Sequence, residues 1–319
     1  MKNLLNYCSI SAYENDLTEK GIVLADYLTK YNLDGIEQLI YGTHAADKDY
    51  SPVSVGVHLA YWPYWLGFWR NNTPSMQKQF KNTNEKSKYF HGAENTNEWL
   101  EAIKNNIHTA LKQKPEYLVW HIADCSTETA YTFNFDYDDV SVIKAAAEVF
   151  NQTSDCIPEN VMVLFENLWW PGLRLLNKEI VRLFFSLINR KNVGIMLDTG
   201  HMLNTNDKLS NQQQAVDYIY KIILNLGSEA ARIKGMHLSC SLSGNYQRSF
   251  EHTVPEDISY RILLKHIVSI DQHLPFTNTA IQKILDLLQP EYVVHELNYK
   301  DFSQLDTLLP RQLAACGLL

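Results

Sequence analysis

A single (β/α)8 barrel spanning residues 1–319 is the fold class that the sequence predicts, and three observations indicate it. Eight short apolar runs alternate with stretches of helical periodicity. Six of these runs end in histidine, aspartate or glutamate, and the active site of such a barrel lies at the C-terminal ends of its strands. The chain also has no G-x-G-x-x-G motif and no P-loop, the nucleotide cradles typical of open doubly wound sheets.

The predicted strands are short apolar runs, as expected for parallel strands that helices cover on one side. The clearest run extends from Val193 to Asp198, is apolar on both faces and ends in a carboxylate. Gly200 follows it and would let the chain turn sharply, so that His201 returns over the same end of the strand. The eight runs cover residues 3–10, 35–40, 54–59, 116–122, 161–167, 193–198, 233–239 and 291–297.

Between the runs, apolar residues recur with the spacing of an amphipathic helix. In residues 16–31, for example, Leu17, Leu24 and Leu28 repeat in this way. Two longer connections, residues 61–92 after the third strand and 240–276 after the seventh, are interpreted as long loops at the active-site end. The predicted helices cover residues 16–31, 94–113, 137–151, 173–189, 211–226, 277–288 and 303–315.

Composition restricts the class of partner. The net charge of −8 disfavours binding to duplex DNA, because such a protein must neutralise phosphates with lysine and arginine. The five cysteines are dispersed and form no C-x-x-C pair, which favours reduced thiols and a cytoplasmic location. No apolar run is long enough for a membrane span, and the N-terminal run is too short for a signal peptide.

The six polar strand ends predict a metal site. Any one of these histidines alone is more often a hydrogen-bonded core residue than a ligand. Six ligand types at one mouth are different, because unpaired buried charges are costly and a cation compensates them. Imidazole and carboxylate suit zinc first, with manganese, magnesium or cobalt as alternatives. The six are His58, His121, Glu166, Asp198, His237 and Glu296.

Side-chain alternation extends this prediction to the layer below. The residues two positions earlier should also face the barrel axis, and they are apolar and partly small, which predicts a dry and roomy floor. The same alternation points His295 outward, as a core histidine or one that supports the site from behind. The floor residues are Gly56, Val119, Leu164, Met196, Gly235 and Val294.

Four short motifs resemble those of the xylose isomerase-like barrel superfamily. This group includes sugar isomerases and epimerases and the family-2 apurinic endonucleases (endonuclease IV). The motifs are short, but their order and spacing are specific, and the resemblance covers nearly the whole chain. They are Leu-Asp-Thr-Gly-His at 197–201, Glu166-Asn167, Met236-His237-Leu238 and Val294-His295-Glu296.

The two branches of the superfamily imply different ligand sets. The isomerases need one group, Glu166, Asp198, His237 and Glu296, around one metal or sometimes two. The endonuclease pattern adds further ligands and implies up to three zinc ions, with Glu166 shared by two of them. Its implied groups are His58, His121 and Glu166; Glu166, Asp198, His237 and Glu296; and His201, Asp271 and His273.

The chain departs from the endonuclease pattern in several places. More than thirty residues separate His237 from Asp271, where the endonucleases have a short link, and His252 within this insertion is a candidate replacement ligand. Trp169-Trp170-Pro171 follows Glu166-Asn167 in place of smaller residues, and the fourth strand lacks the family's His-Pro-Gly. The metal chemistry can therefore be shared while the substrate differs.

Aromatic residues follow two of the ligand-bearing strands. They either form a stacking wall for a sugar or flat heterocycle, or pack the core of their own loops, and both interpretations stay open. The candidate substrate-binding residues are Tyr61, Trp62, Trp65, Trp169 and Trp170.

The sequence thus favours a metal-dependent phosphoester hydrolase that acts on a small-molecule or nucleotide-like substrate. The alternative is a divalent-metal sugar or sugar-phosphate isomerase or epimerase, in which Glu166 and Glu296 are the catalytic acid and base. A non-enzymatic binding barrel is disfavoured, because every ligand position of the pattern is present.

Overall fold

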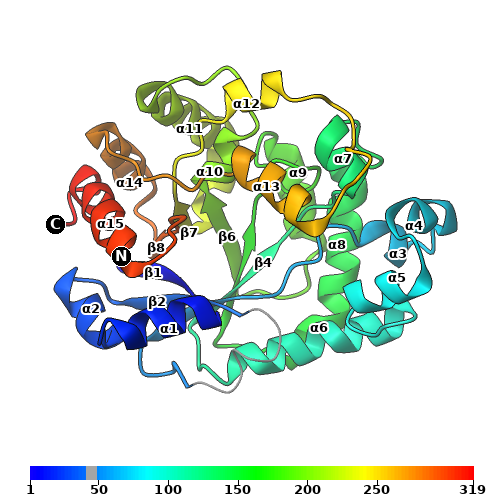
Figure 1. Cartoon of the computed structure of the whole chain (residues 1–319), viewed down its shortest axis with the longest axis horizontal. Helices are drawn as coiled ribbons and strands as arrows, with labels where there is room; N and C mark the ends of the chain where they lie inside the picture. Colours follow the sequence, from blue (N-terminus) through cyan, green and yellow to red (C-terminus); the bar gives the residue numbers. More distant parts are fainter. Residues whose placement is uncertain (41–48) are drawn as a thin grey trace.

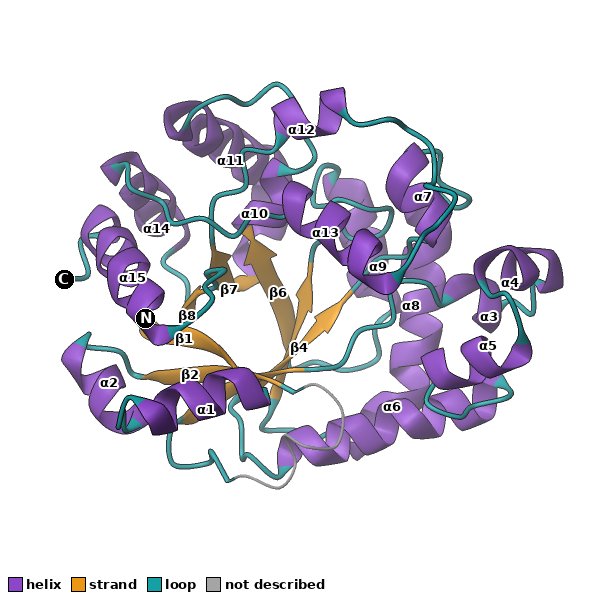
Figure 2. Ribbon diagram, viewed as in Figure 1, coloured by secondary structure: helices purple, strands orange, loops and turns teal. Residues whose placement is uncertain are grey.

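Eight parallel strands close into a barrel in chain order, with β1 paired to both β2 and β8. The structure is a computed structural model that describes residues 1–40 and 49–319 (Figures 1 and 2). The predicted (β/α)8 barrel is confirmed. Its strands are β1 Lys2–Cys8, β2 Gly35–Leu39, β3 Ser54–His58, β4 Tyr117–His121, β5 Met162–Glu166, β6 Val193–Asp198, β7 Ile233–Leu238 and β8 Tyr292–His295.

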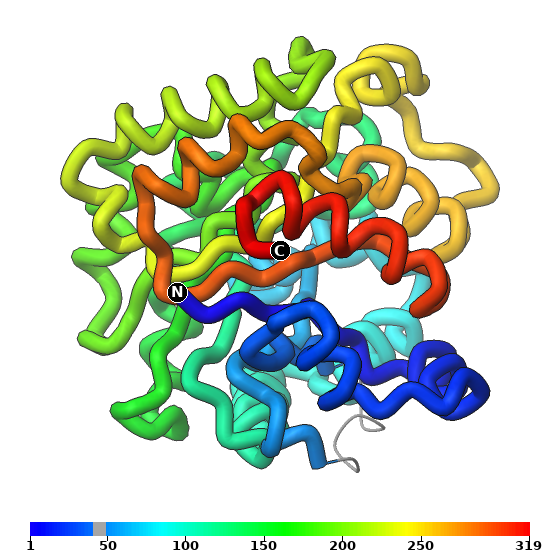
Figure 3. The backbone as a smooth tube through the Cα atoms, turned by 90° about the vertical axis from the view of Figure 1, so that its left-hand side faces the viewer, coloured from blue at the N-terminus to red at the C-terminus, as the bar shows by residue number. Residues whose placement is uncertain are grey.

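Helices surround the barrel, and most of the predicted ones are present with shifted ends. Asparagine or aspartate caps five of them by accepting a backbone N–H of the first turn, which is why they begin where they do. In Figure 3, α15 passes close to β1, and both chain ends lie on the same side. The predicted helices that the structure contains are α6 Thr96–Leu111, α8 Asp139–Thr153, α9 Lys178–Leu187, α11 Gln212–Leu226, α14 Gln282–Leu288 and α15 Phe302–Cys316.

The single helix predicted over residues 16–31 is wrong. The chain forms α1 Ser11–Glu19 and α2 Leu24–Lys30, with a break at Gly21. Gly21 has a φ of 62°, a left-handed conformation that glycine adopts at little cost and that commonly ends a helix. The apolar spacing continues across the break because both helices pack against the same core.

The two long connections also contain helices that the sequence analysis did not predict. Figure 1 shows α12 and α13 at the end of the barrel toward which the strand arrows point. The shorter α7 Thr127–Thr132 and α10 Thr199–Leu203 follow β4 and β6. The connection helices are α3 Leu66–Trp69, α4 Thr73–Gln79, α5 Thr83–Tyr89, α12 Gly244–Ser249 and α13 Tyr260–Ile270.

The barrel floor is filled rather than roomy, which corrects the sequence prediction. Val119, Leu164, Met196 and Val294 form an inner apolar cluster, as alternation requires. The space above Gly56 is occupied, however: a Cβ there would lie 2.2 Å from Cζ of Tyr117. The glycine is small because a tyrosine ring crosses the barrel at this level.

Candidate metal centre

The strand ends bring the predicted ligand residues together. His121 is paired with Glu166 across β4 and β5, and Asp198 with His237 across β6 and β7. Glu296 follows β8 directly, because that strand ends one residue earlier. Glu166 is paired with Met196 of β6, two residues before Asp198, so the stagger of the strands around the barrel, and not a common register, brings these side chains to its mouth.

Glu166 is the centre of this cluster and is almost fully buried. Its Oε2 lies 3.0 Å from Nε2 of His58 and 3.0 Å from Nε2 of His121. Its Oε1 lies 3.1 Å from Nδ1 of His201 and 3.2 Å from Nδ1 of His237. Each carboxylate oxygen therefore faces two imidazoles.

Four residues around Glu166 have the composition and spacing of a metal site. Ligand atoms of Glu166, Asp198, His237 and Glu296 all lie within 4.8 Å of one another. One buried polar atom of each, Oε1, Oδ2, Nδ1 and Oε2 respectively, makes no hydrogen bond of regular geometry among residues 1–40 and 49–319, although Nδ1 of His237 lies 3.2 Å from Oε1 of Glu166 and 3.0 Å from Oε2 of Glu296. Buried polar atoms are normally paired, so four converging exceptions fit a divalent cation. We call this set the carboxylate quartet.

A second group forms at Asp271, just after α13. Asp271 Oδ2 lies 3.1 Å from Nε2 of His201 and 2.6 Å from Nε2 of His273. Asn204 and Ser241 donate to the other oxygen of Asp271 and hold the carboxylate in place. We call His201, Asp271 and His273 the outer triad; the long insertion after β7 does not separate its members.

The third implied group, His58 with His121 and Glu166, is divided in the structure. Each histidine contacts the same Glu166 oxygen, but the compact clusters are His58, Glu166 and His237, and His121, Glu166 and His201. All nine predicted ligand residues belong to at least one cluster. His252 belongs to none of those found: it is exposed and packs beside Phe250.

Most imidazoles are oriented by a hydrogen bond to the nitrogen that faces away from the cluster. Nδ1 of His58 lies 3.0 Å from the carbonyl oxygen of Leu59, and Nδ1 of His273 lies 3.1 Å from that of Glu296. A carbonyl oxygen only accepts, so Nδ1 carries a proton, and Nε2, which faces the carboxylates of the cluster, is the nitrogen that would bind a cation.

The turn after β6 brings His201 over the end of the strand by a different route from the predicted one. Asp198 accepts the backbone N–H of His201 and caps α10, so the chain enters a helix instead of a sharp glycine turn. Gly200 is required for a close approach: a Cβ there would lie 2.5 Å from Oγ of Ser239. Nδ1 of His201 also lies 2.9 Å from the carbonyl oxygen of Asn167.

Burial and close charges shift the pKa values in the cluster. Burial raises the pKa of Asp198 to about 7, with a contribution from Glu296. Burial alone would lower the pKa of His273, but Asp271 and Glu296 raise it to about 10. Burial opposes the charge of Glu166, yet the surrounding histidines hold its pKa well below the usual value. A cation would therefore displace protons from the histidines as it binds.

Two further buried polar residues, His295 and Glu37, lie close to the ligand residues in the barrel wall and floor, and only Glu37 contacts the cluster. Nε2 of His295 lies 2.6 Å from Oδ1 of Asn3, and Gln312 contacts Nδ1, so His295 faces away from the cluster as predicted. Glu37 was not predicted, although a glutamate inside a short buried strand was a visible signal. Its carboxylate lies 2.9 Å from Nε2 of His237.

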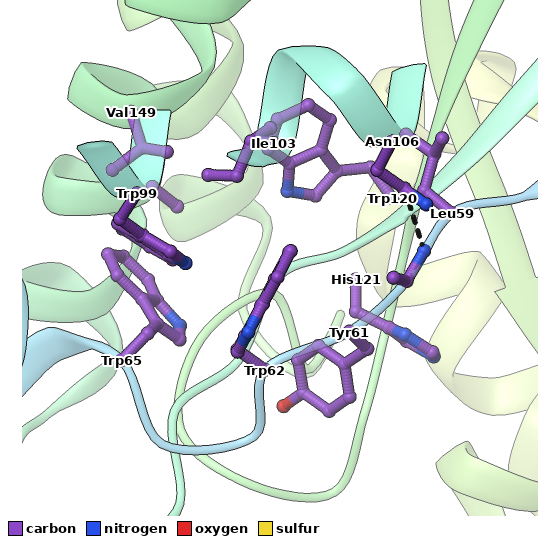
Figure 4. Close-up of a pocket in the computed structure, with 12 residues that line it drawn as sticks. Leu59, Tyr61, Trp62, Trp65, Trp99, Ile103, Asn106, Trp120, His121 and Val149 are labelled. Atoms are coloured by element: carbon purple, nitrogen blue, oxygen red, sulfur yellow. Dashed lines mark hydrogen bonds between the residues drawn. The ribbon is translucent and has the colours of Figure 1, made fainter. Parts of the chain in front are cut away.

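The aromatic residues divide between the mouth and the core. A cavity of about 560 Å3 opens above the cluster, and Tyr61, Trp62, Trp169 and Trp170 line it. Trp65 does not: its Nε1 donates to the carbonyl oxygen of Ala123. Figure 4 shows Trp62 and Trp65 around a second, small cavity of about 40 Å3 behind Tyr61 and His121.

Known proteins resemble the chain in fold and, in part, in sequence. It superimposes on a D-tagatose 3-epimerase-like protein (TM-score 0.55, 15% identity, covering 99% of this chain and 98% of that one). It also superimposes on endonuclease IV from Thermus thermophilus (TM-score 0.53, 10% identity, 100% of both chains). An IOLI protein with a binding zinc atom is similar as well (TM-score 0.55, 14% identity, 99% and 98%).

At these identities the structural similarities show the fold alone. No curated protein sequence matches the chain. The sequence profile of the xylose isomerase-like TIM barrel, in contrast, matches residues 102–302, which include every predicted ligand except His58. The chain therefore belongs to the xylose isomerase-like TIM barrel family.

Proposed function

We propose that the protein is a metal-dependent phosphoester hydrolase that acts on a small or nucleotide-like substrate. Zinc is the metal that its ligands suit best. The observation that carries this proposal is the outer triad. A mononuclear isomerase needs only the carboxylate quartet, whereas this chain adds three further ligand residues, with Asp271 Oδ2 3.1 Å from His201 and 2.6 Å from His273. Two more histidines, His58 and His121, contact Glu166 from the other side.

The residues have separable roles in such a reaction. Bound divalent ions supply Lewis-acid stabilisation of a phosphoryl group and lower the pKa of water. The quartet and the triad would each hold an ion; Oε1 of Glu166 faces one histidine of each group, His237 and His201, while Oε2 faces His58 and His121. Protonated histidines balance the carboxylates in the metal-free protein, and they would bind a cation as neutral imidazoles, so that they would not reduce the charge it offers to the substrate.

The mouth above the cluster favours a substrate with one anionic group and a flat apolar part. Among the described residues that line the 560 Å3 cavity there is no lysine or arginine, so the anion would be bound by the metal ions. Two of the polar residues that line it, Gln79 and Thr127, hydrogen-bond to each other at 3.0 Å in both directions. Tyr61, Trp169 and Trp170 supply ring faces.

The geometry of the mouth disfavours duplex DNA. Leu263, Leu264 and Ile267 of α13 line the same cavity, so this helix narrows the approach to the cluster. The net charge of −8 opposes binding to a polyanion of any length. A small-molecule or single-nucleotide substrate meets neither obstacle.

A sugar or sugar-phosphate isomerase or epimerase is the second candidate, and the quartet by itself favours it. In that case Glu166 and Glu296, whose side chains flank His237, would serve as base and acid on the substrate carbon. The outer triad would then have no role in the chemistry.

The deciding experiment measures metal content and activity together. Protein purified without chelator or added metal is analysed for metal per chain, then assayed on phosphomonoesters and phosphodiesters with aryl and nucleoside groups, and on ketoses and their phosphates. We expect more than one zinc per chain, phosphoester cleavage that chelator abolishes and zinc restores, and no sugar epimerisation. A single ion per chain with epimerisation would favour the second candidate instead.

A further inference from the structure

Glu37 is a buried carboxylate that contacts the cluster from below. It lies in the middle of β2 with no exposed surface. Three side chains contact it: Tyr117 donates its hydroxyl, 2.8 Å from Oε2; Asn6 donates at 3.3 Å from Oε1; and Nε2 of His237 lies 2.9 Å from Oε1. No lysine or arginine is paired with Glu37 among the described ion pairs, so its strongest polar neighbour is an imidazole of the metal cluster.

The imidazole of His237 stands between Glu37 and the carboxylate quartet. Its Nδ1 lies 3.0 Å from Oε2 of Glu296 and 3.2 Å from Oε1 of Glu166, while Nε2 faces Glu37 on the opposite edge of the ring. If Nε2 carries the proton that Glu37 accepts, Nδ1 keeps its lone pair for a cation. A carboxylate behind the imidazole also increases the basicity of the ligating nitrogen.

The floor of the barrel is built to hold Glu37 in this position. Tyr117 lies across the barrel over Gly56, where any side chain would collide with its ring, and this placement brings the hydroxyl to Glu37. Tyr117 and His237 have no exposed surface either. A buried carboxyl group is costly, and a glutamine could fill the same volume, so the presence of glutamate here requires an explanation.

We infer that Glu37 is a positioning residue that fixes the tautomer of His237 and strengthens metal binding at the carboxylate quartet. The inference rests on the metal site of the proposed function but holds for hydrolase and isomerase alike. It assigns a role to a residue of β2, a strand that contributes no ligand to the cluster. The relay runs from the Tyr117 hydroxyl through Glu37 to His237.

The test compares zinc affinity in Glu37→Gln with that in the wild type, by competition with a chromophoric chelator. The substitution keeps the size of the side chain and can keep the hydrogen bond with Tyr117, but it removes the charge behind His237. We expect zinc affinity at the quartet to fall about tenfold to hundredfold, while the unfolding temperature in excess chelator changes little. In the cobalt-substituted protein, the ligand-field absorption bands should shift as well.

Asp124→Asn is the matched control. Asp124 is a buried carboxylate that accepts the backbone N–H groups of Trp65 and Leu66. Its loss removes a buried negative charge without touching the cluster, so zinc affinity and the cobalt spectrum should equal those of the wild type. Glu37→Asp, which keeps the charge but withdraws it from His237, should give an intermediate affinity and serves as the test if the glutamine variant does not fold.

The outcomes separate the inference from the proposed function. Wild-type affinity in both Glu37 variants, with metal bound normally, would overturn the role of Glu37 and leave the hydrolase proposal standing. An equal loss of zinc affinity in Asp124→Asn would also overturn it, because the removal of any buried carboxylate would then weaken zinc binding. If wild-type protein binds no zinc or cobalt at all, the metal site itself fails, and both proposals fall together.

Discussion

His201 Nε2 lies 3.1 Å from Oδ2 of Asp271, although the two residues are 70 positions apart in the chain. Asp198 caps the short helix that carries His201, and α13 ends immediately before Asp271. The insertion after β7 therefore has two effects: it delivers a carboxylate and a histidine to the cluster, and its apolar side lines the mouth. The same insertion therefore both covers the site and supplies two of its ligand residues.

This coupling predicts that Asp271→Asn removes phosphoester hydrolysis but leaves the quartet able to bind metal. We expect turnover to fall about a hundredfold or more, since an ion that stabilises transition-state charge contributes several kcal/mol. Metal analysis should show a lower zinc content with the quartet still occupied. His252→Gln changes an exposed histidine outside the cluster and should match the wild type. Full activity in Asp271→Asn would exclude a role for the outer triad.

Glu166→Gln should abolish turnover under either proposed function. The substitution keeps the volume of the side chain but removes the charge that four imidazoles face. We expect a loss of at least about a thousandfold in kcat, with far-ultraviolet circular dichroism unchanged. Glu148→Gln is the control, because Glu148 is a partly exposed side chain on α8, outside the cluster. Activity that survives in the Glu166 variant would contradict both enzymatic proposals.

The strand ends of this barrel could be predicted from sequence because the signal is local. Val193 to Asp198 is buried almost throughout, and a charged residue at the end of such a run has only the mouth to occupy. The same logic located His58, His121 and Glu166. A resemblance was needed for Asp271 and His273, because they follow a helix in an insertion and no periodicity links them to the barrel.

Three features could not be predicted in this way, for physical reasons. Gly21 breaks a helix without breaking the apolar spacing, since both halves pack on one core. Tyr117 fills the floor from the start of β4, so alternation within one strand does not reveal that it covers Gly56. Glu37 stands out in the sequence as a glutamate inside a buried strand, but its contact with the cluster depends on a partner on β7, 200 residues away in the chain.

Metal binding should strengthen steeply as pH rises. Asp271 and Glu296 raise the pKa of His273 to about 10 against the effect of burial, and carboxylates likewise raise the pKa of His201 and His237. Near pH 7 these imidazoles hold protons in the metal-free protein, and zinc must displace them. Zinc affinity should therefore rise about tenfold or more between about pH 6 and pH 7.5. Calorimetry in buffers of different ionisation enthalpy would detect about one or more protons released per ion; no release would contradict the predicted charge state.

The same pKa shifts set the sign of the stability change with pH in the metal-free protein. The pKa of His273 is raised from 6.5 to about 10, so its contribution is complete below pH 6.5 and is lost as pH rises through 10. Burial raises the pKa of Asp198 from 3.8 to about 7, so this group destabilises the fold increasingly between those values. Metal-free protein should thus become less stable from about pH 5 to about pH 9, and saturating zinc should reverse that trend. Urea unfolding at several pH values measures both curves.

Trp169 should contribute to substrate binding more than to turnover. It lines the mouth cavity, its ring centre lies 5.3 Å from that of His201, and its Nε1 has no hydrogen-bond partner in the described structure. Trp169→Leu keeps an apolar side chain but removes the ring face, so KM for aryl or nucleoside phosphoesters should rise about threefold to tenfold with kcat nearly unchanged, the equivalent of ~0.5–1.5 kcal/mol. Trp65→Phe, which lies behind the mouth and loses the bond to Ala123, should lower the unfolding temperature and leave KM unaltered. If KM responds equally to both substitutions, the rings act by packing the loop and the substrate does not stack on Trp169.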